Sequence, residues 1–182
     1  MKFAIADNHF NHEGIIHSCY RSFKNIWSMN AHMIKCWNDR VATNDIIYSI
    51  GDMIFPVTRP GSMLPEEILA KLNGRIIYIP SQEYSHERAL KGLDDRFEKI
   101  TQLLTLKEMI NGEKKYITLC HYPMDSWPKS YHGSWQLHGH CHCRGPKKKN
   151  RLDVGVDGHK FFPWSFDEII EYMENQKEEK KI

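Results

Sequence analysis

Acidic residues and histidines gather at a few points of this 182-residue chain, in combinations that suit metal binding. The chain contains eleven histidines. Six potential metal ligands stand in four short segments that read D-N-H, G-D, H and G-H-C-H: Asp7, His9, Asp52, His121, His140 and His142. A mixed set of carboxylates and imidazoles favours Mn, Fe or Zn over Mg and Ca, which prefer oxygen ligands alone.

The number of these ligands indicates two ions rather than one. A closed zinc site needs only four ligands. Two ions about 3.5–4 Å apart can share one carboxylate and still leave positions for water. Water that bridges two such ions is deprotonated near neutral pH and can attack phosphorus, while the ions hold the phosphate oxygens and offset the charge of the transition state. The chemistry expected of this arrangement is the hydrolysis of phosphoric esters.

The candidate ligands directly follow short apolar runs that are typical of buried strands. We expect strands at residues 2–6, 46–50, 75–79, 134–137 and 152–156, and a hairpin that joins 103–110 to 114–120. Asn111-Gly112 marks the hairpin turn, because both positions of such a turn require positive φ. Functional groups of α/β folds gather at the carboxyl ends of strands. The ligands should therefore meet at one edge of the fold.

Helices are predicted between and after these strands. Apolar spacing and capping signals place them at residues 26–41, 65–72, 85–93 and 166–175. Ser165 and Glu168 form a capping box for the last of them. The alternation predicts an α/β fold with a mixed, sandwiched sheet. The length suits one domain over residues 1–182, in which 176–182 form a frayed, charged tail.

Composition excludes several classes of protein. The net charge of +2 is too small to favour a nucleic-acid or membrane partner. No apolar stretch approaches the roughly 20 residues that cross a bilayer, and the N-terminal run is too short for a signal peptide, so we expect a cytoplasmic protein. Five cysteines fit reduced thiols better than disulfides. Cys141 and Cys143, which stand among the histidines, leave a structural zinc knuckle open as another interpretation.

In this order, the motifs resemble those of the calcineurin-like metallophosphoesterase superfamily, whose pattern is D-x-H, G-D, G-N-H-D/E, H and G-H-x-H. The sequence is most similar to small, uncapped bacterial and phage members. Their first motif continues as it does here through Phe10 and His12, and their fourth as in Tyr122 and Pro123. The resemblance covers nearly the whole chain. It implies a four-layer αββα sandwich of two mixed β-sheets flanked by helices.

The resemblance also implies a role for each candidate residue. The ligands would divide between two ions, with Asp7, His9 and His142 on the first, His121 and His140 on the second, and Asp52 bridging both. Mn²⁺ is the ion most expected, with Fe, Zn or Ni as other occupants. His12 would line the substrate pocket.

The third motif departs from the family pattern. After the strand 75–79 the chain reads P-S-Q-E-Y-S-H-E in place of G-N-H-D/E. In a direct alignment, Gln82 replaces the Asn that ligates the second ion, and Glu83 replaces the His that protonates the leaving group. A slipped alignment instead places His86 at that His. We prefer the direct alignment because the next helix then begins normally, and both Glu83 and His86 remain candidate general acids.

These observations predict a dinuclear metal-dependent phosphoesterase that hydrolyses phosphodiesters or phosphomonoesters. Few residues remain for a cap, so the pocket should be open, which favours diesters or nucleotide-like substrates. Two alternatives are kept. The altered third motif would suit a metal-binding scaffold that serves protein interactions with little catalysis. The basic run at 147–151 would suit a nuclease, although binding to nucleic acid is not favoured.

Overall fold

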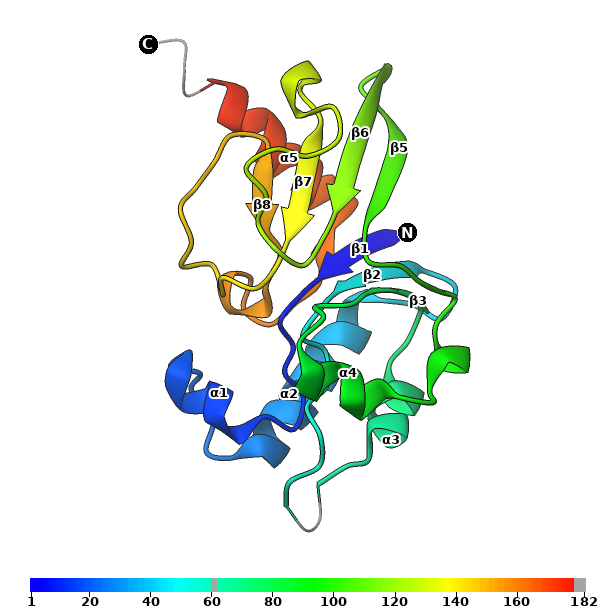
Figure 1. The fold of residues 1–182 in the computed structure, drawn as a ribbon, viewed down its shortest axis with the longest axis vertical. Coiled ribbons are helices and arrows are strands. Elements are labelled where there is room, and N and C mark those ends of the chain that lie inside the picture. The colour runs from blue at the N-terminus through cyan, green and yellow to red at the C-terminus, as the bar shows by residue number, and fades with distance from the viewer. Residues whose placement is uncertain (60–61, 179–182) are drawn as a thin grey trace.

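Two β-sheets and five helices form layers in the computed structural model, which describes residues 1–59 and 62–178 (Figure 1). The order of the first sheet is β4 (Lys99–Ile100), β3 (Arg75–Ile79), β2 (Ile46–Ile50), β1 (Lys2–Ile5) and β9 (Trp164–Ser165). The order of the second is β5 (Leu104–Ile110), β6 (Glu113–Leu119), β7 (Trp135–His138) and β8 (Arg151–Asp153). Both sheets are mixed: β9 is antiparallel to β1 and β5 to β6, while the other pairs are parallel. The predicted α/β sandwich of two mixed sheets is confirmed.

Helices cover one face of the first sheet, and the second sheet lies against the other (Figure 1). These helices are α1 (Glu13–Ser18), α2 (Ile26–Arg40), α3 (Pro65–Lys71) and α4 (Tyr84–Leu90), whereas α5 (Phe166–Glu178) packs into the second core. On α2, Met29, Met33 and Trp37 recur at every fourth position, and this spacing buries one stripe of the helix in the core with β1 and β2. None of the described helices is long and apolar enough to cross a membrane.

A second core fills the space between the sheets. Tyr48 and Ile50 of β2 face Leu119 of β6 and Trp135 of β7 within it, and all four side chains are buried. Ile169 and Met173 of α5 belong to the same core. The alternation of side chains along each strand thus gives the first sheet two buried faces, because helices pack on one and strands on the other.

The last helix is longer than its sequence pattern indicates. The Ser165–Glu168 capping box is present, with the Ser165 amide donating to Glu168 Oε2 at 2.8 Å and the Glu168 amide donating to Ser165 Oγ at 3.2 Å. Residues 176–178, expected in a frayed tail, continue α5 instead. Gln176 Oε1 accepts a hydrogen bond from the Asn150 amide at 3.0 Å. This contact holds the end of α5 against the loop before β8, so the tail does not begin at residue 176 as predicted. Residues 179–182 lie outside the described part of the chain.

Most predicted elements agree with the structure within a few residues. The helix expected at 85–93 begins at Tyr84 and ends at Leu90, and the strand expected at 152–156 ends at Asp153. The turn residues Asn111 and Gly112 have the expected positive φ, 51° and 81°. The short elements that were not predicted include α1, β4 and β9. The two strands have only two residues each, too few to show a period of two.

The parallel strands bring their carboxyl ends to one edge, where the two sheets are joined. The Ala6 amide donates to the Val154 carbonyl, and the Val156 amide donates to the Ala6 carbonyl, both at 3.1 Å. The His9 amide donates to the Asp52 carbonyl at 2.8 Å, which ties the loop after β1 to the loop after β2. The loops that carry the candidate ligands are therefore held together by main-chain hydrogen bonds.

Candidate metal centre

The candidate ligands stand on loops that leave the strands of both sheets in a strained conformation. Five of the six residues have φ between 47° and 70°: Asp7, His9, Asp52, His140 and His142. Non-glycine residues in this left-handed region cost about 1–3 kcal/mol each and are concentrated at functional sites. The strain indicates that the fold holds these side chains in place for a purpose other than stability.

Asp52 lies at the middle of the group. Its Oδ2 is 3.4 Å from Nε2 of His9 and 3.7 Å from Nε2 of His121, and its Oδ1 is 3.8 Å from Nε2 of His86. Oδ1 of Asp7 is 3.9 Å from Nδ1 of His121. Asp52 thus stands between a residue expected to hold the first ion and one expected to hold the second, where a bridging carboxylate would have to be.

The ligand atoms come close enough together to share ions. Asp7, His9 and His142 can present ligand atoms within 4.8 Å of one another, and so can Asp7, Asp52 and His121. The structure therefore brings together five of the seven candidate ligands, and Gln82, the seventh, is exposed in the loop after β3. His140 belongs to neither group. It is exposed at the rim, with its ring 5.3 Å from the ring of His121 and 4.7 Å from that of Tyr122.

Four buried polar atoms of this cluster have no hydrogen-bond partner among the described residues: Asp7 Oδ2, Asp52 Oδ1, His9 Nε2 and His121 Nε2. Such atoms are rare in native proteins, because each one costs free energy when it is removed from water. Two carboxylate oxygens and two imidazole nitrogens that face a common space would all be satisfied by cations. By this test, the residues fit divalent metal ions of the Mn, Fe or Zn type.

In two of the candidate ligands, His121 and His142, the ring nitrogen Nδ1 makes a hydrogen bond within the protein. Nδ1 of His121 donates to the Ile50 carbonyl at 2.9 Å, and Nδ1 of His142 donates to Oδ2 of Asp157 at 2.7 Å. Each bond fixes the orientation of the ring and leaves the Nε2 lone pair for a metal, as metal-ligating histidines usually require.

Glycines allow the main chain to approach the ligands closely. A Cβ atom on Gly51 would lie 2.2 Å from Nδ1 of His121, and one on Gly155 would lie 2.7 Å from Oδ2 of Asp7. Both distances are shorter than any real Cβ contact, so a side chain at either position would displace a ligand. The sequence motifs include Gly51 but give no sign of the role of Gly155.

A buried arginine supports the loop after β1 from behind. Arg21 donates to both carboxylate oxygens of Asp157, at 2.8 and 2.9 Å, and to the carbonyls of Asp7 (2.7 Å) and Asn8 (2.8 Å). Because Asp157 in turn holds His142, Arg21 connects loops of both sheets. Sequence reasoning missed Arg21 and Asp157 as functional residues. The one signal in the sequence for Asp157 was its position as an acidic residue shortly after the strand that became β8.

The third motif is the part of the site where the direct alignment and the structure differ most. Gln82 and Glu83 are both exposed. The Tyr122 hydroxyl donates to the Ser81 carbonyl at 2.6 Å and to Oε1 of Glu83 at 3.1 Å. His86 is buried in the first turn of α4, where its Nδ1 donates to the Ile54 carbonyl at 3.0 Å. The structure thus places His86, rather than Gln82 or Glu83, beside Asp52.

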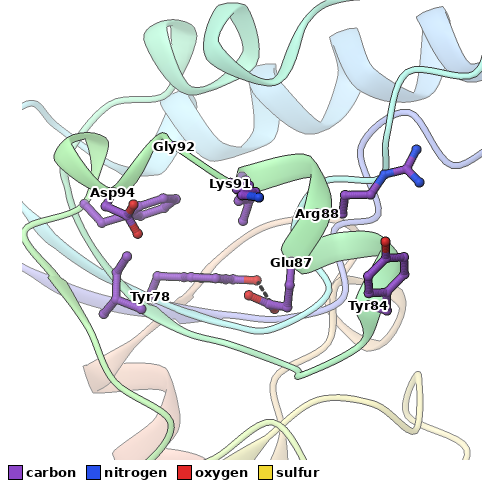
Figure 2. Close-up of a pocket in the computed structure, with 10 residues that line it drawn as sticks. Tyr78, Tyr84, Glu87, Arg88, Lys91, Gly92 and Asp94 are labelled. Atoms are coloured by element: carbon purple, nitrogen blue, oxygen red, sulfur yellow. Dashed lines mark hydrogen bonds between the residues drawn. The ribbon is translucent and has the colours of Figure 1, made fainter.

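The opposite side of α4 holds this loop in position (Figure 2). Glu87, next to His86, points into a cavity of about 480 Å³, where its Oε1 accepts a hydrogen bond from the Tyr78 hydroxyl at 3.1 Å. The Glu87 carboxyl also accepts hydrogen bonds from the amides of Ser81 and Gln82, while burial raises its pKa. Glu87 therefore ties the altered third motif to the helix that carries His86.

His12 lies beside the proposed ligands. Its ring stacks on that of Phe55 with centroids 4.2 Å apart, and its Nδ1 is 3.2 Å from Nδ1 of His9. Burial lowers the pKa of His12 to about 4. With His9 and His86 it forms a further group whose ligand atoms lie within 4.8 Å of one another. The predicted substrate residue is therefore next to the centre and is uncharged at neutral pH.

Comparison with known proteins identifies a relative similar enough in sequence to show the family of the chain. No family model matches the chain. The uncharacterized protein MJ1445 of Methanocaldococcus jannaschii is 32% identical to it over 183 residues, which cover 96% of this chain and 92% of MJ1445. The chain belongs to the family of MJ1445. The crystal structure of AQ665, a protein of unknown function from Aquifex aeolicus, has a TM-score of 0.68 to this family member and 22% identity, over 94% of this chain and 98% of AQ665. At that identity, the similarity shows a shared fold.

In the absence of metal, we expect the stability of the folded protein to depend on pH, because Asp7 is buried. Burial raises the pKa of Asp7 from 3.8 to about 8, so the folded chain keeps a proton that the unfolded chain has lost. Stability should therefore fall as the pH rises toward 8. Histidines with lowered pKa values, among them the buried His9, His86 and His121, oppose this effect until their unfolded imidazoles are deprotonated, about one pH unit above 6.5. Between pH 6.5 and 8, we expect Asp7 itself to contribute a loss of about 2 kcal/mol, seen as the difference between the wild type and Asp7→Asn.

Urea unfolding of the chelator-treated protein at pH 6.5 and pH 8 measures this loss. The Asp7→Asn variant should have a flatter dependence, because its side chain carries no titrating proton. An equally steep dependence in Asp7→Asn would show that another group is responsible. Added Mn²⁺ should reverse the trend, since metal binding displaces the Asp7 proton and becomes more favourable as the pH rises.

Proposed function

We propose that the chain is a dinuclear metal-dependent phosphoesterase of the calcineurin-like type. The observation that carries the proposal is a set of four buried polar atoms that lack hydrogen-bond partners within residues 1–59 and 62–178. They belong to Asp7, His9, Asp52 and His121, on loops of both sheets. A stable fold without ions would leave these carboxylate oxygens and imidazole nitrogens unsatisfied. Their order along the chain, together with His140 and His142, supports the resemblance in the sequence.

The residues divide into roles by position. Asp7, His9 and His142 would hold one ion and His121 the other, with His140 completing the second set from the rim and Asp52 reaching both. When bound, such a pair of ions supplies a deprotonated water for attack on phosphorus and positive charge for the phosphate oxygens. The chain's own task is to keep the ligands oriented, through the Nδ1 hydrogen bonds of His121 and His142.

His86 is the residue we assign to protonation of the leaving oxygen. It is buried, its Nδ1 is held by the Ile54 carbonyl, and its Nε2 faces Asp52 at the centre. Glu83 is exposed and shares the hydroxyl of Tyr122. A proton donor must reach the leaving group before its pKa matters, and the position of His86 meets that condition better. The slipped alignment of the third motif is therefore favoured for this role.

The substrate class follows from the open side of the centre. His140, Gln82 and Glu83 are all exposed, which leaves the side of the second ion accessible to solvent. An accessible centre suits phosphodiesters or nucleotide-like esters better than a small enclosed metabolite. Nucleic acid is less favoured, because two side chains of the basic run 147–151 are engaged within the protein. Lys148 pairs with Asp125 at 3.1 Å, and Arg151 donates to the carbonyls of Met124 and Pro146.

The proposal is tested by stripping the purified protein with a chelator, restoring Mn²⁺ and assaying an aryl phosphodiester and an aryl phosphomonoester. We expect hydrolysis of at least one ester that is lost on stripping and regained with Mn²⁺. Ions bound at the centre without turnover of any ester would favour a metal-binding scaffold instead. Absence of metal-dependent stabilisation and turnover together would reject both.

A further inference from the structure

The segment H-G-H-C-H-C at residues 138–143 carries more metal-binding side chains than the dinuclear centre uses. His140 and His142 are assigned to that centre, which leaves His138, Cys141 and Cys143. Near them, Asp153 ends β8. A Cβ atom on Gly155 would lie 2.7 Å from Oδ2 of Asp7 and 2.9 Å from Oδ1 of Asp153, so the two carboxylates approach each other at the Cβ position that Gly155 leaves free. Neither Asp7 nor Asp52 is among the described residues that line the cavity shared by His138, Cys141 and Asp153, so these three side chains face a space of their own.

Three of these residues converge. His138, Cys141 and Asp153 can present ligand atoms within 4.8 Å of one another. All three line a cavity of about 210 Å³, together with Cys143, Trp164 and the basic residues Lys147, Lys148 and Arg151. The cluster therefore has both a set of donors and space for an ion with its water.

The imidazole of His138 and the carboxylate of Asp153 are oriented as metal ligands require. His138 is 5% exposed, and its Nδ1 donates to the Gly139 carbonyl at 2.8 Å, which leaves Nε2 for a metal. The oxygens of Asp153 accept hydrogen bonds from the amides of Gly155 (2.8 Å) and Cys143 (2.9 Å), and each keeps a free lone pair. Supporting hydrogen bonds of this kind fix the ligands around protein-bound metals.

We propose that His138, Cys141 and Asp153 form a separate third metal site that takes one Zn²⁺-type ion. Thiolate, imidazole and carboxylate are the three ligand types of protein-bound zinc, and a water completes the four positions. The ion would join the loop after β7 to the end of β8. Because the same loop carries His140 and His142, the third site would brace two ligands of the dinuclear centre.

The donor sets allow the third site to be observed alone. The proposed dinuclear centre contains only carboxylates and imidazoles, whereas the third site contains the Cys141 thiolate. A Co²⁺ ion bound through sulfur shows a thiolate-to-metal charge-transfer band in the near ultraviolet. We expect this band when the reduced, chelator-stripped full chain is titrated with Co²⁺, and we expect it to saturate at one sulfur-bound ion per chain.

Variants of single cysteines locate the source of the band. Cys141→Ser should abolish it, while Cys143→Ser, two residues along the same loop, should keep it. Cys19→Ser should also keep it, although Cys19 lies in a group with His142 and Asp157. His138→Gln should weaken Co²⁺ binding at the band by at least about tenfold, since losing even a supporting group costs 10–100-fold in metal affinity. The His138→Gln variant leaves every thiol in place, so it tests the site without removal of a cysteine.

The outcome that would overturn the third site is a wild-type protein without the band, or a band that survives Cys141→Ser. Asp52→Asn separates the two proposals, because it removes the bridging ligand of the dinuclear centre and should leave the band unchanged. Loss of the band in Asp52→Asn would place the sulfur-bound ion in the dinuclear centre and would contradict a separate site.

Discussion

Asp52→Asn is expected to lower the Mn²⁺-dependent hydrolysis of an aryl phosphodiester by about 10³-fold or more. Loss of one contact that stabilises the transition state already costs about 10²–10³-fold in such sites. The carboxylate of Asp52 lies near both His9 and His121, which places it to contact both ions. An amide has a single, uncharged oxygen donor and cannot replace two anionic oxygens.

Asp39→Asn is the matched control for this variant. Asp39 is exposed on α2, where it pairs with Lys35 one helical turn away, and exposed pairs of this type contribute little to stability. The activity of Asp39→Asn should equal that of the wild type. In the absence of metal, Asp52→Asn should be at least as stable as the wild type, because it removes a negative charge next to Asp7. Full activity in Asp52→Asn would contradict the assigned bridging role.

His86→Gln is expected to lower the hydrolysis of esters with poor leaving groups by about 10²–10⁴-fold, the usual contribution of a general acid. Esters of good leaving groups should lose much less, because their leaving oxygen needs little protonation. Burial also lowers the pKa of His86, so its acidic form is the minor one at neutral pH. The wild-type rate on poor leaving groups should therefore decrease as the pH rises above that lowered pKa, and the variant should lack this decrease.

Glu83→Gln distinguishes the two candidate acids of the third motif. Glu83 is exposed and should show the smaller loss, with the same leaving-group dependence as the wild type. The reverse pattern would make Glu83 the donor and restore the direct alignment. Metal analysis of His86→Gln completes the comparison. Loss of an ion in that variant would show that His86 is a ligand, a role that its proximity to His9 and His12 would permit.

The sequence was sufficient for the longer strands of both sheets and for the convergence of five candidate ligands at one edge. Apolar runs ended by polar residues predicted β1, β2 and β3 almost to the residue, because buried parallel strands need continuous apolar side chains. Once those strands were known to be parallel, Asp7 and Asp52 had to lie at the same edge. Spacing within a motif and the ends of strands therefore carried the prediction.

The remaining features depend on contacts that local sequence does not encode. Arg21 and Asp157 meet across 136 positions, and nothing near Arg21 marks it as a partner of Asp157. The alignment of the third motif depended on where α4 begins. Because the helix begins at Tyr84, its first turn directs His86 inward toward the Ile54 carbonyl. That start also involves the hydrogen bonds of Glu87 to the preceding loop, which only the folded chain shows.

The pairing of two ions around Asp52 is tested most directly by anomalous diffraction from crystals of the wild-type protein grown with Mn²⁺. The expected result is two anomalous peaks about 3.5–4 Å apart, one on either side of the Asp52 carboxylate, with Asp7, His9 and His142 around the first and His121 and His140 around the second. A single peak, or peaks that do not contact Asp52, would contradict the dinuclear centre.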